Sequence, residues 1–570
     1  MAKKIYQEDN RIKILCICFF VVSFLIIIRL FIIQILKHSH YLALAEQQHW
    51  IVQDIPAERG KIFSADGALL ASNIDYYLLY AEPLRISEKA DLAKKLSELL
   101  SSEERGSSAE LFSKYYDLLD RDLWWVALES KIDPVLKKKI EEQNLEGIGF
   151  EIFPVRYYPE KTLASHVLGF IAQDDKGERV GYFGVEGYLD GDLRGKPGKI
   201  LQEKDAFGNP ILIGGYDQVA PIPGRDVFLT IDRSVQYIVE KSLKEAVEKY
   251  GAESGTVIVM NPLNGQVIAM ANYPWFDPAN LEKESDAKNL AISDVYEPGS
   301  VMKPFTVSAG LDTGKISPNS VFVDSGPVIY SDYTIDNWDG KHHGTQDIAQ
   351  LLQKSNNIGA AWVGHLTGSK ELYRHLVEFG FGKKTGVDLE GEDTGIIRPF
   401  ETWTDIDLAN ISFGQGISAT PLQVLNAFNV FANGGYLYRP QMVYQISTDK
   451  GVINLESKPI RRVLPQKVVD QMHELLISAV DQGESKFFNI EGYKIAGKTG
   501  TAQIPKDGKY DPSATNATFL GYLANSKRYS MLVRLERPKT SYFASETAVP
   551  LWMDITRQLV SYYSIPPDNQ

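Results

Sequence analysis

An almost unbroken apolar run from Ile14 to Leu36 constrains the fold of this chain more than any other feature. Its about 23 residues are enough to cross the hydrocarbon core of a bilayer as one helix. Four positive side chains precede the run, namely Lys3, Lys4, Arg11 and Lys13. Because positive residues favour the cytoplasmic side, we expect a cytoplasmic N-terminus at residues 1–13, a transmembrane helix at residues 14–36, and folded domains on the extracytoplasmic side.

A cleavable signal peptide is the competing interpretation, since Ala43-Leu44-Ala45 resembles a cleavage site. The uncleaved anchor is favoured because the run is longer than a usual signal core and because Arg29 and Gln34 interrupt it. Arg29 itself has two open interpretations. It is either a functional or paired residue inside the membrane, or it reaches to the outer headgroups.

The composition narrows the class of protein. A chain of 570 residues is too long for one ordinary core, so two or three domains are expected. The formal net charge of −13 argues against general nucleic-acid binding. Both cysteines, Cys16 and Cys18, lie inside the apolar run, so the rest of the sequence has no disulfide and no thiolate metal site.

The first half of the chain shows no catalytic pattern. Residues 38–57 and 84–145 are expected to be mainly helical, and residues 150–230 mainly strands and turns. Asp66-Gly67 between two apolar runs predicts a hairpin. His166 is interpreted as structural, and a domain boundary is expected near Pro221-Ile222-Pro223-Gly224.

The second half predicts strands at both ends of a helical middle. Asp232 is expected to cap a helix, and residues 261–265 to turn between two strands. Strands are expected again at 518–523 and 529–536, and helices and loops at 290–440. A final helix carries Leu551, Ile555, Leu559 and Tyr562. This order indicates an α+β domain.

The stretch from Tyr296 to Phe305 carries a serine three residues before a lysine, after a Pro-Gly pair. If a helix opens at Ser300, Lys303 lies one turn on and on the same face. A desolvated lysine amine can then take the proton of the serine hydroxyl and make it a nucleophile. The pattern is short, however, and it recurs at Ser285–Lys288 and Ser447–Lys450.

Two further motifs favour the first copy, because they follow it in order. Ser355-Asn356-Asn357 comes next, and Lys498-Thr499-Gly500-Thr501-Ala502 comes last. Acyl transfer needs a nucleophile, a base, a proton carrier and donors for the oxyanion. Ser300 and Lys303 supply the first two, Ser355 can relay a proton, and Asn357 can hold a substrate amide with both ends of its side chain. Lys498 supplies positive charge, Thr499 can bind a carboxylate, and Gly500 leaves a strand edge open.

Two other patterns have simpler explanations. Lys384-Thr385-Gly386 repeats the last motif, but it runs into an acidic stretch and is interpreted as a loop. His342-His343 suggests a metal site, yet glycines flank the pair and no third ligand is evident. We therefore expect no metal and no cofactor, and a solvated loop near the cleft.

A family resemblance that includes these motifs covers nearly the whole chain. The region from about 224 to 563 resembles the transpeptidase domain of class B penicillin-binding proteins, and the region before it resembles their non-catalytic pedestal. The supporting segments in the first region are Leu229–Asp232, Tyr296–Ser300, Ser412–Gly416, Thr420–Gln423 and Gly497–Ala502. Those in the pedestal are Arg59–Ile62, Arg156–Pro159, Gly184–Glu186 and Gly195–Gly198.

The resemblance implies a fold and a set of roles. It implies an elongated mixed pedestal at residues 37–223 and, at residues 224–570, a transpeptidase domain with an antiparallel sheet flanked by helices. Ser300 would be the acylated nucleophile and Lys303 its base, with Ser355, Asn357, Lys498 and Thr499 lining the cleft. The backbone N–H groups of Ser300 and Thr501 would form the oxyanion hole. The chain departs from the family at Ser64-Ala65 and Ala544-Ser545, both outside the chemical core.

The expected function is a D,D-transpeptidase that cross-links peptidoglycan stem peptides on lipid II-derived strands and is acylated by β-lactams. A carboxypeptidase or β-lactamase on the same fold, and a β-lactam-binding scaffold or sensor without turnover, remain as alternatives. The resemblance favours the division type over the elongation type. It implies a single-pass protein of the cytoplasmic membrane whose partner is a polytopic glycosyltransferase, with other divisome or elongasome proteins.

Overall fold

The computed structural model describes residues 2–42, 50–103, 105–203, 216–330, 333–506 and 509–568. It consists of two compact units. The first is Met1–Glu58 with Gly195–Gly224, and the second is Arg59–Arg194 with Arg225–Gln570. The domain bounds expected at residues 37–223 and 224–570 stay predictions.

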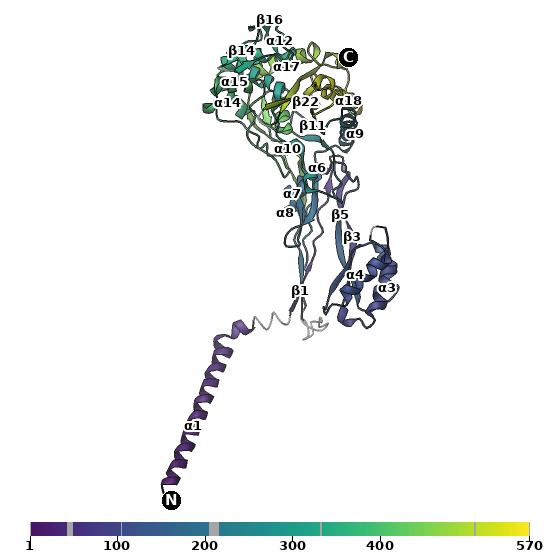
Figure 1. Ribbon diagram of the computed structural model, residues 1–570, viewed down its shortest axis with the longest axis vertical. Coiled ribbons are helices and arrows are strands. Elements are labelled where there is room, and N and C mark those ends of the chain that lie inside the picture. Colours follow the sequence, from purple (N-terminus) through teal and green to yellow (C-terminus); the bar gives the residue numbers. More distant parts are fainter. Residues whose placement is uncertain are drawn as a thin grey trace. The chain divides into compact units, whose positions relative to one another are not determined.

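The first unit contains a long apolar helix and a small sheet. Helix α1 (Ala2–Phe31, purple in Figure 1) continues into the π-helical turns of Ile32–Leu36. Within it, Arg11–Leu36 is long and apolar enough to cross a membrane. The helix therefore begins well before Ile14, where the apolar run starts. The tripeptide at residues 43–45 lies outside the described residues.

The sheet of the first unit corrects one prediction. Strand β8 (Gly198–Glu203) lies between β1 (Trp50–Ile55) and β9 (Tyr216–Val219), and both pairs are antiparallel. The helix expected over residues 38–57 is thus wrong for 50–55. That stretch carries an aromatic and three β-branched residues, which favour a strand, and β8 supplies the pairing partner from far along the chain.

In the second unit, the predicted hairpin at Asp66-Gly67 is confirmed. It joins β2 (Ile62–Phe63) to β3 (Leu69–Ala81). Strand β3 also pairs with β4 (Val126–Ile132) and β5 (Ile148–Tyr157). Helices α3 (Lys89–Leu100), α4 (Ser108–Leu119) and α5 (Pro134–Glu141) surround β4. The helical expectation for 84–145 therefore missed β4, whose charged sequence becomes a strand through pairing with β3.

This sheet crosses the expected domain boundary. Strand β2 pairs in parallel with β10 (Val227–Leu229), and β10 pairs with β18 (Val443–Thr448). The pedestal segments and the C-terminal region thus share backbone hydrogen bonds. Since each buried backbone group needs a partner, these strands cannot separate without leaving unpaired groups.

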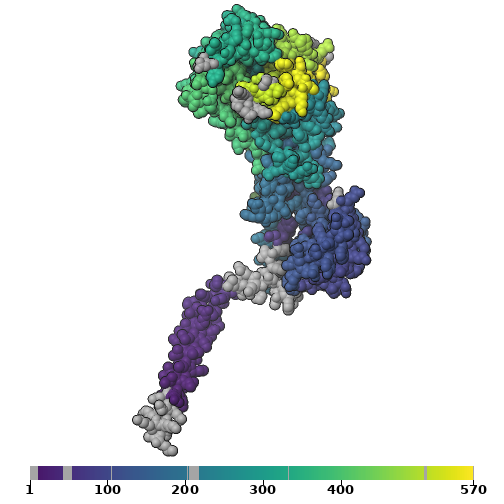
Figure 2. All heavy atoms as spheres, in the orientation of Figure 1, coloured from purple at the N-terminus to yellow at the C-terminus, as the bar shows by residue number. Residues whose placement is uncertain are grey.

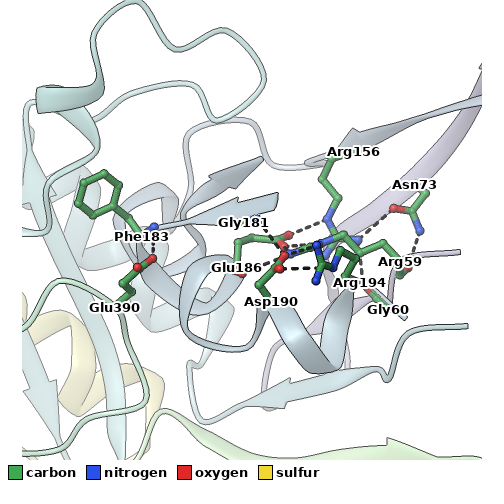
Figure 3. A network of polar contacts seen from close by, with 10 residues as sticks. All are labelled: Arg59, Gly60, Asn73, Arg156, Gly181, Phe183, Glu186, Asp190, Arg194 and Glu390. Carbon is green, nitrogen blue, oxygen red and sulfur yellow. Dashed lines mark hydrogen bonds and ion pairs between the residues drawn. The ribbon is translucent and has the colours of Figure 1, made fainter. Parts of the chain in front are cut away.

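A buried ion cluster ties the pedestal motifs to one another (Figure 3). Glu186 in α7 (Gly184–Tyr188) accepts from Arg59 Nε at 2.8 Å and from Arg156 Nε at 2.7 Å. Arg59 Nη1 also donates to Asp190 at 2.8 Å, and Arg156 Nη1 donates to the carbonyl of Gly60 at 2.8 Å. Three of the segments that carry the family resemblance therefore meet at one carboxylate, which is fully buried.

The C-terminal part of the second unit is built on a five-stranded antiparallel sheet, which confirms the α+β class. The strand order is β12-β11-β23-β22-β21. The strands are β11 (Ser254–Met260), β12 (Val267–Tyr273), β21 (Ile495–Lys506), β22 (Lys509–Leu523) and β23 (Ser530–Glu536). The predicted turn at 261–265 and both predicted late strands are confirmed.

Helices cover both faces of this sheet (Figure 1). Val257 and Val259 pack with α9 (Arg233–Tyr250) and α18 (Ala548–Tyr562), whereas Ile258 and Met260 belong to the core on the other face. This alternation follows from the two-residue period of a strand. Asp232 caps α9 through the backbone N–H groups of Ser234 and Val235, as predicted. In Figure 2 the yellow C-terminal residues are seated among teal and green residues from the middle of the chain.

The remaining elements are short helices and strands. The helices are α6 (Ser165–Leu168), α8 (Asp190–Leu193), α10 (Leu290–Ser293), α11 (Lys303–Asp312), α12 (Ile348–Gln353), α13 (Asn357–Thr367), α14 (Ser369–Glu378), α15 (Asp405–Ser412), α16 (Pro421–Phe428) and α17 (Gln466–Asp481). The strands are β6 (Phe170–Gln173), β7 (Arg179–Tyr182), β13 (Val321–Asp324), β14 (Val328–Tyr330), β15 (Tyr333–Ile335), β16 (Gly344–Asp347), β17 (Tyr436–Tyr438), β19 (Gly451–Asn454) and β20 (Pro459–Arg462).

Candidate active site

Ser300 lies in a 3₁₀ turn, η4 (Gly299–Met302), that runs directly into α11. Gly299 starts the turn at a positive φ of 59°, and its N–H donates to the carbonyl of Gly414 at 3.0 Å. A side chain at Gly299 would also come within 2.9 Å of Ala502. Glycine therefore fits both the left-handed backbone and the close approach. Lys303 follows one turn later, as predicted, with its Nζ 2.9 Å from Ser300 Oγ.

The amine of Lys303 is completely buried and surrounded by oxygen atoms. Its Nζ lies 2.5 Å from the carbonyl of Ser355 and 2.8 Å from Asn357 Oδ1, and both of these atoms only accept hydrogen bonds. The hydroxyls of Ser300 and Ser355 lie 2.9 and 3.1 Å away. A neutral amine fits this shell, because its two hydrogens go to the pure acceptors and its lone pair faces the hydroxyls.

The electrostatics favour that neutral form. Burial is the largest influence, and repulsion from Lys498 is the next; together they hold the pKa of Lys303 well below that of an ordinary lysine. Attraction to Glu484 opposes the shift. Lys303 can therefore act as a base where a solvated lysine would be protonated.

Ser355 lies between the two lysines. It occupies the connection from α12 to α13 with a positive φ of 54°, a conformation that non-glycine residues adopt only when the surroundings hold it. Its Oγ is 3.1 Å from Lys303 Nζ and 3.1 Å from Lys498 Nζ. One hydroxyl thus connects both amines, which suits a proton relay.

Lys498 and Thr499 lie on β21, the edge strand of the sheet. Burial lowers the pKa of Lys498, and Glu484 opposes that shift. Lys498 Nζ donates to Thr499 Oγ1 at 3.1 Å, and Thr499 Oγ1 donates to Glu484 Oε2 at 2.8 Å. The sequence predicts that Thr499 binds a carboxylate, and in the structure the carboxylate that it contacts is the side chain of Glu484.

Both ends of the Asn357 side chain make contacts within the protein. Its Oδ1 accepts from Lys303, and its Nδ2 donates to the carbonyl of Asp336 at 3.0 Å. Each end keeps further capacity, because the oxygen has a second lone pair and the nitrogen has a second hydrogen. The role expected for Asn357, which is to hold a substrate amide with both ends, therefore stays a prediction.

The reason expected for Gly500 is wrong. Gly500 is buried, and a Cβ there would lie 2.8 Å from Val301 Cγ1 and 3.1 Å from the carbonyl of Pro298. The missing side chain therefore lets β21 approach the turn that carries Ser300. It serves the packing of that turn and does not leave space for a substrate.

Asp324, which no sequence pattern pointed to, organises the Ser355 segment. Its buried carboxylate accepts from Asn356 Nδ2 at 2.7 Å and from Asn337 Nδ2 at 2.9 Å. Asn337 Oδ1 in turn accepts from the N–H of Asn357 at 3.1 Å. Burial alone would raise the pKa of Asp324, but these hydrogen bonds, with that of His342, outweigh it and lower the pKa.

His342 belongs to this same cluster. Its Nδ1 lies 3.2 Å from Asp324 Oδ1, and its Nε2 lies 3.7 Å from Asp336. Across the part of the chain that the structure describes, no group of three or more His, Cys, Asp or Glu side chains is placed to hold a metal. His342 is therefore paired with two carboxylates, whereas His343 contacts Asp324 through its backbone N–H.

Serine, asparagine and threonine residues of the three motifs line one cleft of about 480 Å³, whereas the buried side chains of Lys303 and, against expectation, Lys498 are not among its lining residues. Its walls include Ser300, Ser355, Asn357, Thr499 and Thr501. The competing copies of the motifs lie elsewhere. Ser447 Oγ accepts from the N–H of Asp226, Thr385 contacts Glu392 in its loop, and Ser285 lines a separate hollow. His166, which is also outside the cleft, is buried against the carbonyl of Asp286.

Comparison with known proteins agrees with this arrangement. The family model described as penicillin binding protein transpeptidase domain matches residues 255–557, and that of the penicillin-binding protein dimerisation domain matches residues 54–229. The chain belongs to the class B penicillin-binding proteins. Within this family it is 31% identical over 560 residues to stage V sporulation protein D of Bacillus subtilis, covering 96% of this chain and 85% of that protein.

Two further relatives of this penicillin-binding protein span similar lengths. Peptidoglycan D,D-transpeptidase FtsI of Buchnera aphidicola is 27% identical, covering 100% of this chain and 97% of that one. The crystal structure of penicillin binding protein 3 from Mycobacterium tuberculosis, complexed with aztreonam, aligns with a TM-score of 0.69 at 25% identity. That alignment covers 90% of this chain and 98% of the other.

Proposed function

We propose that this penicillin-binding protein is a peptidoglycan D,D-transpeptidase that works through an acyl-enzyme on Ser300. The observation that carries the proposal is the buried amine of Lys303, 2.9 Å from Ser300 Oγ and with a strongly lowered pKa. A serine hydroxyl is a weak nucleophile until such a base takes its proton. The relatives named as D,D-transpeptidases support the same reaction class.

In the acylation step, Ser300 Oγ attacks the carbonyl carbon of the penultimate D-alanine of a stem peptide, and its proton passes to Lys303 Nζ. The backbone N–H groups of Ser300 and Thr501 hold the oxyanion. The C–N bond then breaks. The departing D-alanine nitrogen takes a proton that Lys303 gives up through Ser355, whose Oγ touches both lysines.

In the second step, an amine from a neighbouring stem peptide attacks the ester on Ser300. The amine loses a proton to Lys303 along the same path in reverse. The new amide C–N bond forms as the ester C–O bond to Ser300 Oγ breaks, and Ser300 Oγ takes its hydrogen back from Lys303. A β-lactam would acylate Ser300 in the same way as the peptide does. Its opened ring stays attached to the acyl group, so no amine leaves to make room for the second substrate.

A gel with a fluorescent penicillin tests this proposal against its alternatives. We expect stable labelling of the full chain that disappears in Ser300→Ala and persists in Ser285→Ala, the matched serine of a second Ser-x-x-Lys copy. Rapid loss of the label from the parent would favour a carboxypeptidase or β-lactamase. Labelling without cross-linking of stem peptides would favour a scaffold or sensor, and no labelling would contradict every one of these enzymes.

We also propose the cellular setting. The apolar Arg11–Leu36 stretch anchors the chain in the cytoplasmic membrane with the N-terminus inside, and the catalytic region acts outside on the cell wall. The septal assignment and a polytopic glycosyltransferase partner, which Arg29 would contact, rest on family resemblance. Depletion in the source organism tests the role, since filaments indicate division and round cells indicate elongation.

A further inference from the structure

The hydroxyl of Thr499 already makes two hydrogen bonds within the protein. It has one hydrogen, which it donates to Glu484 Oε2 at 2.8 Å, and it accepts from Lys498 Nζ at 3.1 Å. Thr499 is only 5% exposed, so its side chain has little room to turn. An incoming carboxylate can therefore receive the Thr499 hydrogen only if Glu484 releases it.

Glu484 is itself part of the cleft. It lies in the loop between α17 and β21 and lines the same hollow as Ser300 and Thr501. The residue before it fixes the loop, since a Cβ at Gly483 would come within 2.1 Å of the carbonyl of Ala479. The half-buried side chain of Glu484 thus points into the site from a closely packed base.

The charge of Glu484 acts on both lysines. It raises the pKa of Lys498 and the pKa of Lys303, against the lowering that burial causes in each case. The carboxylate of Glu484 therefore lies where the carboxylate of a ligand would bind, beside the Thr499 hydroxyl and the Lys498 amine. A ligand carboxylate that approaches this position finds the Thr499 hydrogen already bonded to Glu484, and the charge of Glu484 repels it.

We propose that Glu484 occupies the carboxylate subsite at Thr499 and thereby lowers the preference of the cleft for acyl donors that carry a free carboxylate. This rests on the proposed function, since it takes Thr499 as the contact for the C-terminal carboxylate of the stem peptide. In the empty cleft, Glu484 holds the Thr499 hydroxyl in place and balances Lys498. When a donor with a free carboxylate binds, Glu484 moves aside and the ligand takes over both contacts.

Two acylating probes that differ only in charge test the proposal. Benzylpenicillin carries a free carboxylate, and its methyl ester does not. The second-order rate of adduct formation on the full-length protein is measured by intact-protein mass spectrometry for each probe, and the quantity compared is the ratio of the anionic to the neutral rate. In Glu484→Gln we expect this ratio to rise about tenfold over the parent, because the like charge is gone.

Three further variants make the result specific. Glu484→Asp keeps the charge and is expected to leave the ratio within about twofold of the parent. Glu491→Gln removes a carboxylate from the exposed part of the same loop and is expected to leave the ratio unchanged. Glu484→Ala should raise the ratio as Glu484→Gln does, which keeps the test open if one of the two fails to fold.

The outcomes separate this inference from the proposed function. An unchanged or lower ratio in Glu484→Gln and Glu484→Ala, with normal labelling of Ser300, would overturn the inference and leave the transpeptidase proposal standing. A parent that forms no adduct on Ser300 with either probe would contradict the proposed function, and the inference would fall with it.

Discussion

The cleft and the pedestal each hold two basic side chains largely out of water, but the surroundings raise the pKa of an arginine in the pedestal and lower the pKa of both lysines in the cleft. In the pedestal, Arg59 and Arg156 both meet Glu186 at 2.7–2.8 Å, and Asp190 adds a second carboxylate for Arg59. Burial alone would lower the pKa of Arg59, yet its pKa is raised because these carboxylates outweigh it. In the cleft, Lys303 and Lys498 share the hydroxyl of Ser355, and both of their pKa values are lowered.

The difference lies in the pairing. A buried charge is stable only when an opposite charge and hydrogen bonds replace the water that it has lost. The pedestal supplies both and obtains a fixed joint between three distant segments (Figure 3). Among the residues that the structure describes, the cleft places no carboxylate against the amine of Lys303, and burial with repulsion from Lys498 lowers its pKa, as a base requires. Arginine suits the first task and lysine the second, because the guanidinium does not lose its proton.

Removing Lys303, the proposed base of the cleft, should have the largest effect. In Lys303→Ala we expect acylation by a fluorescent penicillin to slow by about 10³-fold, within the usual range for general-base catalysis. The matched control is Lys288→Ala, which alters a second Ser-x-x-Lys copy outside the cleft. Its rate should equal that of the parent, and an equal loss in both variants would contradict the assignment.

Removing Glu186, the carboxylate that Arg59 and Arg156 share in the pedestal, should destabilise the fold. Glu186→Gln leaves the buried guanidinium of Arg156 without a carboxylate partner and leaves Arg59 with Asp190 alone, so the free energy of unfolding should fall by about 3–5 kcal/mol. Urea denaturation of the full-length protein in detergent measures the loss, with exposed Glu178→Gln as the control. The folded fraction should still be acylated on Ser300, because the chemistry lies elsewhere. A loss under about 1 kcal/mol would mean that the pedestal charges are not coupled as described.

Asp324 is a buried carboxylate that, unlike Glu186, pairs with no lysine or arginine of the described residues and instead holds the Ser355 segment of the cleft in position. In Asp324→Asn the charge is lost and one oxygen becomes a donor, which faces either the asparagine amides that donate to Oδ2 or His342 Nδ1 at Oδ1. We expect the acylation rate to fall about tenfold while the affinity for the unreacted β-lactam changes less, since positioning acts on the reacting geometry. Stopped-flow labelling separates the two, and exposed Asp449→Asn is the control. An equal loss in affinity would indicate general damage to the cleft.

Much of the fold and of the cleft could be predicted from the sequence, because the informative patterns are local. The Ser300–Lys303 spacing, the cap at Asp232 and the turn at 261–265 each depend on a few neighbouring residues, and all three are found. The order of three motifs also separated Ser300 from Ser285 and Ser447, which no single motif could do. The apolar Ile14–Leu36 run predicted the long helix for the same reason.

The missed features depend on contacts between distant segments. Strand β1 forms because β8, which comes much later in the chain, lies beside it. Asp324 and Glu484 are ordinary acidic residues in sequence, and they matter only because folding brings them to Asn356 and Thr499. Gly500 was assigned to the right segment for the wrong reason, since its close neighbour Val301 is not visible from the strand pattern.

Burial and then repulsion from Lys498 keep the pKa of Lys303 low. The direct test is the pH dependence of Ser300 acylation by benzylpenicillin methyl ester in the parent, Lys498→Met and Lys498→Arg. Loss of the like charge raises the pKa of Lys303, so the base becomes protonated at a higher pH. We predict that the acidic limb of the rate profile in Lys498→Met moves upward by about one pH unit, while that of Lys498→Arg stays in place. An acidic limb in Lys498→Met that stays fixed, or that moves to lower pH, would contradict the claim.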